Sequence, residues 1–271
     1  MVATNMIKRC VCCNSVYLKR VKSFYKPPKK EPDYKIKKYF REIYKCSDCG
    51  NFHNYSKVNM NKIYENDYSQ ISYGTNLWNK LLKIYNLKKK SDNFHRVNRI
   101  LNKYKKYKNF SVLDVGAGFG LFLYTINKKK KNWKLQAIEP DRNNIRFIQK
   151  KLKIKASKGF IEKISTPKRF NLITLNKVLE HTKRPLQVLN KLKNNLKIDG
   201  EIYIEIPDGE MASKESFLRE EFFIDHYYIF SKASFEKLLD KANFKIISIK
   251  RIKEPSNKFT LFAFVKLKNN K

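Results

Sequence analysis

The sequence predicts an α/β chain with a mostly parallel, doubly wound sheet that has an antiparallel edge, preceded by a small module that carries the cysteines. Three observations support this fold class. After residue 110, short apolar runs alternate with helical patterns of about ten residues. Two further apolar runs close the chain, and all five cysteines lie before residue 50. At 271 residues, the chain can form one full-sized core and a small appendage.

The first part of the chain differs in pattern from the rest. Residues 1–55 hold the cysteines and three closely spaced prolines, and they show little helical periodicity. In residues 56–108, apolar side chains recur at spacings of three and four, which predicts helices that connect two domains. We therefore expect a cysteine module over 1–55, a helical connector over 56–108 and a larger domain over 109–271.

The larger domain is expected to contain the parallel sheet. The strands are predicted at 110–115, 134–139, 170–175 and 201–206. Between them, helices are predicted at 121–127, at 141–152 with Asp141 as the cap, and at 184–196, the last closed by Asp199-Gly200. A final helix starts at Ser231 and reaches 239. The runs 244–250 and 260–267, joined by a polar turn, predict the antiparallel edge.

Composition limits the class of protein. A hydrophobic content of 42% is enough to form a core, which excludes a wholly disordered chain. No segment approaches about 18 consecutive apolar residues, and the first ten residues lack the apolar segment of a signal peptide. We therefore expect a cytoplasmic protein without a membrane span.

The charge is strongly basic, with 60 Lys and Arg against 24 Asp and Glu and a net charge of +36. Such an excess is typical of a nucleic-acid or anionic-surface partner. The lysines are spread along the chain, however, and runs such as 128–131 lie in predicted loops, which is typical of a solvated surface. The stretch 205–225 is instead acidic, and we expect it to repel a polyanion; it contains Glu205, Asp208, Glu210, Glu215, Glu220, Glu221 and Asp225.

Four of the cysteines form two Cys-x-x-Cys pairs. Each pair places two thiolates on one tight turn, and two such turns complete the tetrahedral four-sulfur site that Zn²⁺ accepts. We expect a structural zinc site in a zinc-ribbon-like module, built from Cys10, Cys13, Cys46 and Cys49. Cys12 is an alternative to Cys10 or Cys13, and His53 is a competing ligand. Buried or redox-active cysteines are the other interpretation, whereas disulfides are rare in the cytosol.

A glycine-rich loop follows the first strand of the predicted sheet. Its order is Asp114-Val-Gly-Ala-Gly-Phe-Gly120, so the dinucleotide pattern G-x-G-x-x-G fails at Leu121. A carboxylate at the strand end would repel a pyrophosphate, but it suits the ammonium group of S-adenosylmethionine. Glu139 ends the next strand and is placed to accept hydrogen bonds from ribose hydroxyls. The strand, the glycine loop, the helix that follows it and the carboxylate of Glu139 together predict a cofactor site.

These segments resemble the class I S-adenosylmethionine-dependent methyltransferases. Residues 114–120 are similar to their first motif and residues 137–141 to their second, while 170–181 is similar to the branch whose fourth strand ends in Leu-Glu-His. Asn171 departs from that branch, which usually has aspartate. The resemblance covers about 110–250 and implies a Rossmann-like sheet. It implies cofactor contacts from Asp114, Gly116, Ala117, Gly118, Gly120, Glu139, Pro140, Phe160, Asn176, Tyr68 and Tyr73.

The cysteine module narrows the resemblance to methyltransferases of sugar and polysaccharide biosynthesis. It implies a small acceptor, such as a nucleotide-linked sugar or a glycan precursor. Methyl transfer to a hydroxyl or a carbon acid also requires removal of a proton, for which histidine is suited by its pKa. The methylated atom, carbon, oxygen or nitrogen, stays open.

Two of the four histidines lie where the resemblance places the acceptor. His181 follows the fourth strand, and the pair Asp225-His226 lies in a segment that forms an acceptor-side wall in the family. The catalytic candidates are therefore His181, His226 and Asp225, and which histidine is the base stays open. Polar residues at helix starts are the alternative interpretation. Glu180 is expected to orient its loop by accepting hydrogen bonds from backbone amides, and Tyr64 lies with Tyr68 and Tyr73 in the lead-in segment.

Two other functions compete with this one. Some ribosomal RNA methyltransferases join a zinc ribbon to the same fold, but residues 176–179 do not match the Asn/Asp-Pro-Pro-aromatic signature of many RNA base methylases. The other alternative is a non-catalytic zinc-ribbon binding protein with a degenerate methylase domain. The intact loop from Asp114 to Gly120, together with Glu139, argues against it.

Overall fold

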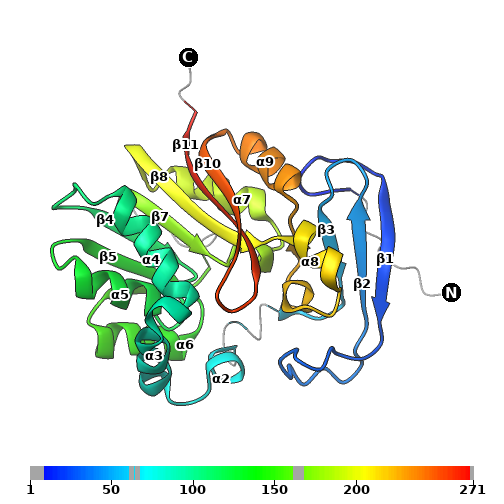
Figure 1. Ribbon diagram of the computed structural model, residues 1–271, viewed down its shortest axis with the longest axis horizontal. Coiled ribbons are helices and arrows are strands. Elements are labelled where there is room, and N and C mark those ends of the chain that lie inside the picture. Colours follow the sequence, from blue (N-terminus) through cyan, green and yellow to red (C-terminus); the bar gives the residue numbers. More distant parts are fainter. Residues whose placement is uncertain (1–8, 61–63, 65–67, 161–167, 269–271) are drawn as a thin grey trace.

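The computed structural model describes residues 9–60, 64, 68–160 and 168–268, and its strands form two sheets (Figure 1). A four-stranded sheet has the order β1-β2-β3-β9, and a seven-stranded sheet has the order β10-β11-β8-β7-β4-β5-β6. The strands are β1 (Leu18–Phe24), β2 (Arg41–Cys46), β3 (Phe52–Tyr55), β4 (Ser111–Val115), β5 (Lys134–Glu139), β6 (Lys155–Lys158), β7 (Phe170–Asn176), β8 (Leu196–Pro207), β9 (Tyr228–Ile229), β10 (Phe244–Lys253) and β11 (Phe259–Leu267).

Helices connect these strands and cover the larger sheet. They are α2 (Tyr68–Tyr73), α3 (Leu77–Asn86), α4 (Asp92–Lys103), α5 (Leu121–Lys129), α6 (Arg142–Phe147), α7 (Pro185–Lys193), α8 (Gly209–Glu215) and α9 (Lys232–Lys241). Short 3-10 turns lie at 88–90, 179–181 and 220–222, and a π-helical turn at 148–152 extends α6. No helix among the described residues is long and apolar enough to cross a membrane.

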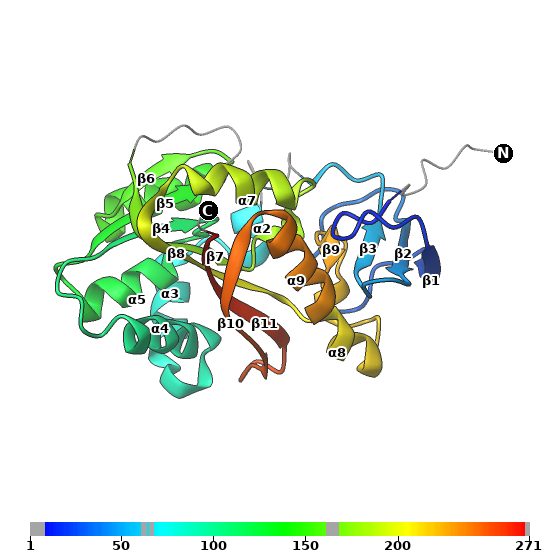
Figure 2. The ribbon, with the colours of Figure 1, turned by 90° about the horizontal axis from the view of Figure 1, so that it is seen from above.

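The seven-stranded sheet confirms the predicted fold class. Its five strands β4 to β8 run parallel, and β11 pairs antiparallel with both β8 and β10. Helices α3 to α6 pack on one face, and α7 and α9 pack on the other (Figure 2). Side chains alternate between these layers, since Val112 joins the core under α4 and α5 while Leu113 joins the core under α7. A strand buried on both faces is largely apolar, which explains Val112, Leu113 and Val115 of β4.

Several boundaries differ from the prediction, and the helix expected over 184–196 ends at Lys193, before Asp199-Gly200. The strand expected at 201–206 begins at Leu196, and its pairing with β7 shifts register between Phe170 and Leu172. Gly200 therefore lies inside a strand at a bulge, where a Cβ would come within 2.9 Å of the Phe170 carbonyl oxygen. The helix expected over 141–152 is capped by Asp141 as predicted, but it changes to a π-helical turn after Phe147.

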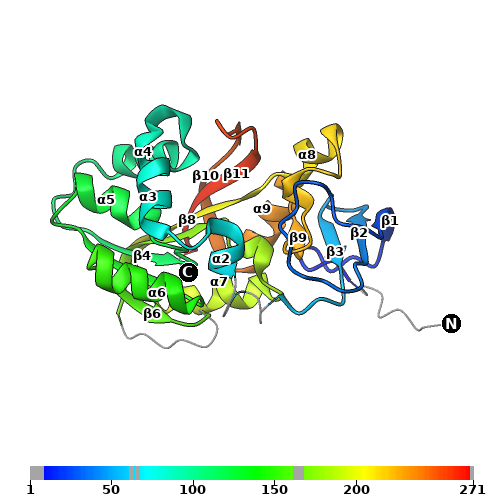
Figure 3. The same ribbon diagram turned by 90° about the horizontal axis from the view of Figure 1, so that it is seen from below.

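The N-terminal sheet is built onto the larger domain. Its fourth strand, β9, comes from the segment before α9 and pairs with β3 through Phe52 and Ile229. Ser231 caps α9 and also donates to the carbonyl oxygen of Cys49. Figure 3 shows α2 between this sheet and the seven-stranded sheet. The segment expected to line the acceptor site is therefore attached to both sheets.

Candidate functional site

The glycine loop closes tightly at the carboxyl end of β4. The backbone amides of Gly116 and Ala117 both donate to the Ile138 carbonyl oxygen, at 2.8 and 3.2 Å. Gly116 has a φ of +67°, and a Cβ there would lie 2.7 Å from a methyl carbon of Val178. Gly120 precedes α5 with a φ of +80°. Both positions require glycine because the backbone is left-handed and neighbouring side chains occupy the space of a Cβ.

Asp114 is buried beneath this loop and is only 1% exposed. Its Oδ1 accepts hydrogen bonds from the Thr174 hydroxyl at 2.6 Å and the Asn176 amide at 2.9 Å. Burial raises the pKa of this carboxyl to about 7, although both hydrogen bonds and the charge of Arg96 oppose the shift. The aspartate therefore links the ends of β4 and β7 and orients Asn176.

Glu139 ends β5 beside the loop and is 4% exposed. Its carboxylate accepts from the Gly118 amide at 2.8 Å and from the Asp141 amide at 3.0 Å. Burial raises its pKa to about 8, opposed by these two hydrogen bonds. The carboxylate is thus held at the sheet edge with its two oxygens in defined directions.

A cavity of about 660 Å³ opens at this edge. It brings together ten of the predicted residues, namely Gly116, Gly118, Glu139, Pro140, Phe160, Asn176, Tyr73, His181, Asp225 and His226. Asp114, Ala117 and Gly120 do not line it; Asp114 is buried, and Ala117 and Gly120 belong to the glycine loop itself. The side chain of Tyr68 lies outside the described residues, whereas Tyr64 does line the cavity.

The predicted catalytic residues form one cluster on the far side of this cavity. His181 Nδ1 lies 2.7 Å from the Tyr64 hydroxyl and 3.0 Å from the Asp225 carbonyl oxygen. The rings of His181 and His226 are 4.6 Å apart between centroids and nearly perpendicular. Burial lowers the pKa of His181, and the charge of His226 lowers it further. His226 Nδ1 lies 2.8 Å from the Glu221 carbonyl oxygen, which directs its Nε2 away from that carbonyl.

The prediction for Glu180 was wrong. Its side chain is fully buried in the turn before His181, and neither carboxylate oxygen has a hydrogen-bond partner among the described residues. The loop is instead held by backbone, since the Glu180 carbonyl oxygen accepts from the Tyr227 amide at 2.7 Å. The carboxylate of Glu180 is therefore available for a role other than holding the turn.

The four predicted zinc ligands gather in the N-terminal sheet. Their sulfur atoms lie within 4.8 Å of one another, with Cys10 to Cys49 at 3.5 Å and Cys13 to Cys46 at 3.6 Å. Four close sulfurs fit the tetrahedral coordination of Zn²⁺. A hydrogen bond from Cys12 lowers the pKa of Cys10, whereas burial raises the pKa of Cys12 itself. Cys12 is not among the four clustered sulfurs.

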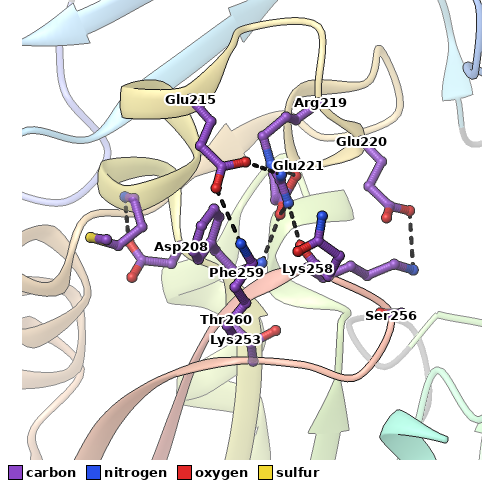
Figure 4. A network of polar contacts seen from close by, with 12 residues as sticks. Asp208, Glu215, Arg219, Glu220, Glu221, Lys253, Ser256, Lys258, Phe259 and Thr260 are labelled. Atoms are coloured by element: carbon purple, nitrogen blue, oxygen red, sulfur yellow. Dashed lines mark hydrogen bonds and ion pairs between the residues drawn. The ribbon is translucent and has the colours of Figure 1, made fainter. Parts of the chain in front are cut away.

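The acidic stretch 205–225 carries less unpaired charge than its sequence suggests. Arg219 bonds to both Glu215 and Glu221, and Lys258 lies 3.1 Å from Glu220 (Figure 4). Outside this network, Arg96 and Arg99 bind Glu205, and Arg251 binds Asp208 and Glu210. The expectation that this stretch repels a polyanion therefore loses most of its basis.

Sequence reasoning missed several residues that line the cavity. Lys30, Pro32 and Tyr34 reach it from the loop between β1 and β2. Nothing local marks them, because their position depends on how the N-terminal sheet packs. Lys177 follows the end of β7 and also lines the cavity. It could have been predicted from the sequence, because it is adjacent to the predicted site residue Asn176.

Comparison with known proteins identifies the larger domain. The sequence model of a family described as "Methyltransferase domain" matches residues 85–249, which is more than half of the chain. The chain belongs to this family. An uncharacterized protein of Methanocaldococcus jannaschii is 30% identical to this chain over 162 residues, 57% of the chain and 63% of the relative. The chain thus spans less than two thirds of that curated relative.

Solved structures share the fold at low identity. A 1,6-didemethyltoxoflavin-N1-methyltransferase of Burkholderia thailandensis has a TM-score of 0.57 and 14% identity over 88% of this chain and 100% of its own chain. An S-adenosylmethionine-dependent methyltransferase of Clostridium acetobutylicum has a TM-score of 0.54 and 15% identity, with coverages of 72% and 100%. The cyclase SpnF also matches, at 0.52 and 10% identity, with coverages of 64% and 80%. The fold is therefore that of class I methyltransferases, and fold alone does not decide the reaction.

Proposed function

We propose that this methyltransferase transfers the methyl group of S-adenosylmethionine to a small acceptor, a nucleotide-linked sugar or a glycan precursor. The observation that carries the proposal is the single cavity, which joins the Glu139 end of β5 to the cluster of His181, Asp225 and His226. A methyl transfer needs its two substrates in line within one enclosed space. The solved N-methyltransferase of Burkholderia thailandensis, whose acceptor is 1,6-didemethyltoxoflavin, is consistent with a small acceptor in this fold.

The cofactor half of the cavity has the groups that S-adenosylmethionine requires. The Glu139 carboxylate would accept from the ribose hydroxyls in exchange for its bond to Gly118. Asn176, held by Asp114, would face the amino acid portion, and Phe160 would contact the adenine ring. Gly116, Pro140 and Tyr73 would complete the contacts. When bound, the cofactor supplies a sulfonium leaving group.

The acceptor half is charged as well as aromatic. Lys30, Lys177 and Lys258 line the cavity together with Tyr34, and this mixture suits a sugar that carries phosphate. For a hydroxyl or carbon acceptor, the groups placed to receive the proton are His181, His226 and Asp225. A zinc ion at the four cysteines would have no open coordination position and would hold the N-terminal sheet that places Tyr34.

Calorimetry with S-adenosylmethionine tests the cofactor assignment. Asp114→Ala should abolish binding, because Asn176 and the end of β7 lose their anchor, whereas Asp199→Ala, near the start of β8 and outside the cavity, should not change the affinity. An unchanged affinity in Asp114→Ala would refute the assignment. His226→Ala should reduce turnover about 100-fold while the cofactor affinity stays the same, and full turnover would remove His226 from catalysis.

The acceptor class is tested with methyl-labelled S-adenosylmethionine and two acceptor sets, nucleotide sugars and total RNA. We expect labelled nucleotide sugar detected by mass spectrometry. Labelled RNA, with an affinity that falls steeply as salt is raised, would favour the RNA methyltransferase alternative instead. Cofactor binding without transfer to either set would favour a non-catalytic protein.

A further inference from the structure

One buried carboxylate of the acceptor side has no partner. Glu180 is 0% exposed, and both of its oxygens lack a hydrogen bond among the described residues. Lys177 is three residues away, but its ammonium group donates to the Thr260 hydroxyl at 2.6 Å. Buried carboxylates are normally hydrogen-bonded, paired with a charge or bound to a metal ion, because an isolated one is costly to remove from water. A cation beside Glu180 would supply the close partner that both of its oxygens lack among the described residues.

The imidazoles of His181 and His226 lie next to this carboxylate. One ligand atom each from Glu180, His181 and His226 lies within 4.8 Å of the other two, so small side-chain movements would bring all three to one metal ion. Both imidazoles have Nδ1 beside a backbone carbonyl, that of Asp225 at 3.0 Å for His181 and that of Glu221 at 2.8 Å for His226. Metal-bound histidines usually show this arrangement, because it fixes the ring and presents Nε2 to the ion.

The two segments that carry these residues are fixed to each other. The Glu180 carbonyl oxygen accepts from the Tyr227 amide at 2.7 Å, next to His226 in the chain. On the other side, the Asn54 amide of β3 donates to the Phe223 carbonyl oxygen at 2.9 Å. The three ligand groups are thus placed before any ion arrives, which lowers the entropic cost of binding one.

We propose that Glu180, His181 and His226 bind a divalent transition-metal cation at the acceptor side of the cavity. Two imidazole nitrogens and one carboxylate oxygen form a three-ligand set that leaves further coordination positions for water or substrate. All three residues line the cavity, so those positions face the space where the acceptor would lie. This site differs in chemistry from the four cysteines, which offer only sulfur.

The catalytic role of this ion rests on the proposed function. An acceptor hydroxyl bound to the cation would have a lowered pKa, and its proton would pass to the Asp225 carboxylate, whose Oδ1 has no hydrogen-bond partner among the described residues. The oxygen–methyl bond forms as the methyl–sulfur bond of S-adenosylmethionine breaks, and S-adenosylhomocysteine leaves. The site therefore favours oxygen as the methylated atom and makes the histidines ligands rather than bases.

Electron paramagnetic resonance with Mn²⁺ tests the site without any substrate. The full chain, with its cysteine site loaded with zinc, is titrated with Mn²⁺, and loss of the free-ion signal measures binding. We expect one Mn²⁺ per chain, with a dissociation constant raised at least tenfold in Glu180→Gln and in His226→Gln. Glu220→Gln, in the same cavity wall, and His95→Gln, on α4 and outside the cavity, are the matched controls and should bind as wild type does. The proposal would be overturned if the wild-type chain did not bind Mn²⁺ at about 1 mM, or if Glu180→Gln bound Mn²⁺ as tightly as wild type does.

A second measurement covers the case in which the variants do not fold. Co²⁺ added to the zinc-loaded wild-type chain should give a visible spectrum without the sulfur charge-transfer bands of a thiolate site. Sulfur bands alone would mean that the ion binds the cysteines and would overturn the assignment. Binding of Mn²⁺ without methyl transfer would refute the proposed function but keep the site. The catalytic role of the ion would be refuted if the wild-type chain, with metal only at its cysteine site, transferred methyl groups at an undiminished rate.

Discussion

The Gly118 amide donates to Glu139 Oε2 at 2.8 Å, so that the glycine loop after β4 and the end of β5 are joined by one hydrogen bond. The resemblance to class I methyltransferases places the cofactor at these two positions of this chain. A ribose that binds Glu139 must take over this interaction. The loop and the carboxylate are therefore coupled before any ligand is present.

Glu139→Gln should weaken binding of S-adenosylmethionine at least tenfold, because an amide offers the ribose hydroxyls one neutral acceptor instead of a carboxylate. The fold should survive, since a glutamine oxygen can still accept from the Gly118 or Asp141 amide. Calorimetry measures the change. Glu201→Gln is the control, because Glu201 bonds to Tyr104 and Lys103 away from the cavity. Equal affinities of wild type and Glu139→Gln would contradict the ribose role.

The affinity for S-adenosylmethionine should increase with pH up to about pH 8. Burial raises the pKa of Glu139 from 4.5 to about 8, so the empty site is largely protonated at neutral pH. Ribose donors favour the ionised form, and each pH unit below that pKa should cost up to about tenfold in affinity. The same slope in Glu139→Gln would show that another group titrates.

Stability without the cofactor should change in the opposite direction. A carboxyl whose pKa is raised in the folded state binds its proton more tightly there than in the unfolded chain. The contribution of Glu139 is therefore greatest below pH 4.5 and is lost as the pH rises towards about 8. Urea unfolding at pH 6 and pH 8 measures it, and Glu139→Gln should lose less stability than wild type between these values.

Gly120→Ala should destabilise the chain more than Gly74→Ala, although both glycines have nearly the same φ, +80° and +79°. A Cβ at Gly120 would lie 2.8 Å from Leu152 and 2.9 Å from Ile148, whereas nothing lies within 4 Å at Gly74. We expect about 1 kcal/mol for Gly74→Ala from the left-handed backbone alone. Gly120→Ala should cost about 2 kcal/mol more, because the core must shift. Equal urea midpoints would mean that side-chain crowding plays no part.

Cys46→Ser should remove tightly bound zinc, while Cys12→Ser should keep it. Cys46 is one of the four clustered sulfurs, and Cys12 is a buried thiol with a raised pKa outside that set. Elemental analysis of chelator-washed protein should find about one zinc per chain in wild type and in Cys12→Ser. Loss of zinc in Cys12→Ser would assign Cys12 as a ligand.

Metal loss should also affect the acceptor side. The zinc site and the acceptor wall are connected, because β3 pairs with β9 and Ser231 bonds to the Cys49 carbonyl oxygen. Cys46→Ser should therefore lower turnover more than it lowers affinity for the cofactor, whose contacts lie on β4 and β5. Equal losses in both would indicate general unfolding.

Much of the candidate site could be predicted because it lies at strand ends. Gly116, Glu139 and Asn176 each follow a short apolar run, and parallel strands bring their carboxyl ends to one edge of the sheet. The cysteine spacing similarly predicted the cluster of four sulfurs. Tyr34 and Lys30 could not be predicted, since they reach the cavity from a loop of the N-terminal sheet. Glu180 was misassigned because its neighbours along the chain do not show that its carboxylate lacks partners.

The sequence by itself determined the α/β class, the glycine loop and the four-cysteine cluster, because each depends on local spacing and on strand order. Only the tertiary structure decided how these parts meet. It showed that β9 completes the cysteine-bearing sheet, that all the acids of 205–225 except Asp225 are paired with arginines and lysines, and that His181 and His226 lie next to a buried Glu180. Those relationships depend on long-range packing and on burial, which set hydrogen bonding and pKa and which no short segment of sequence encodes.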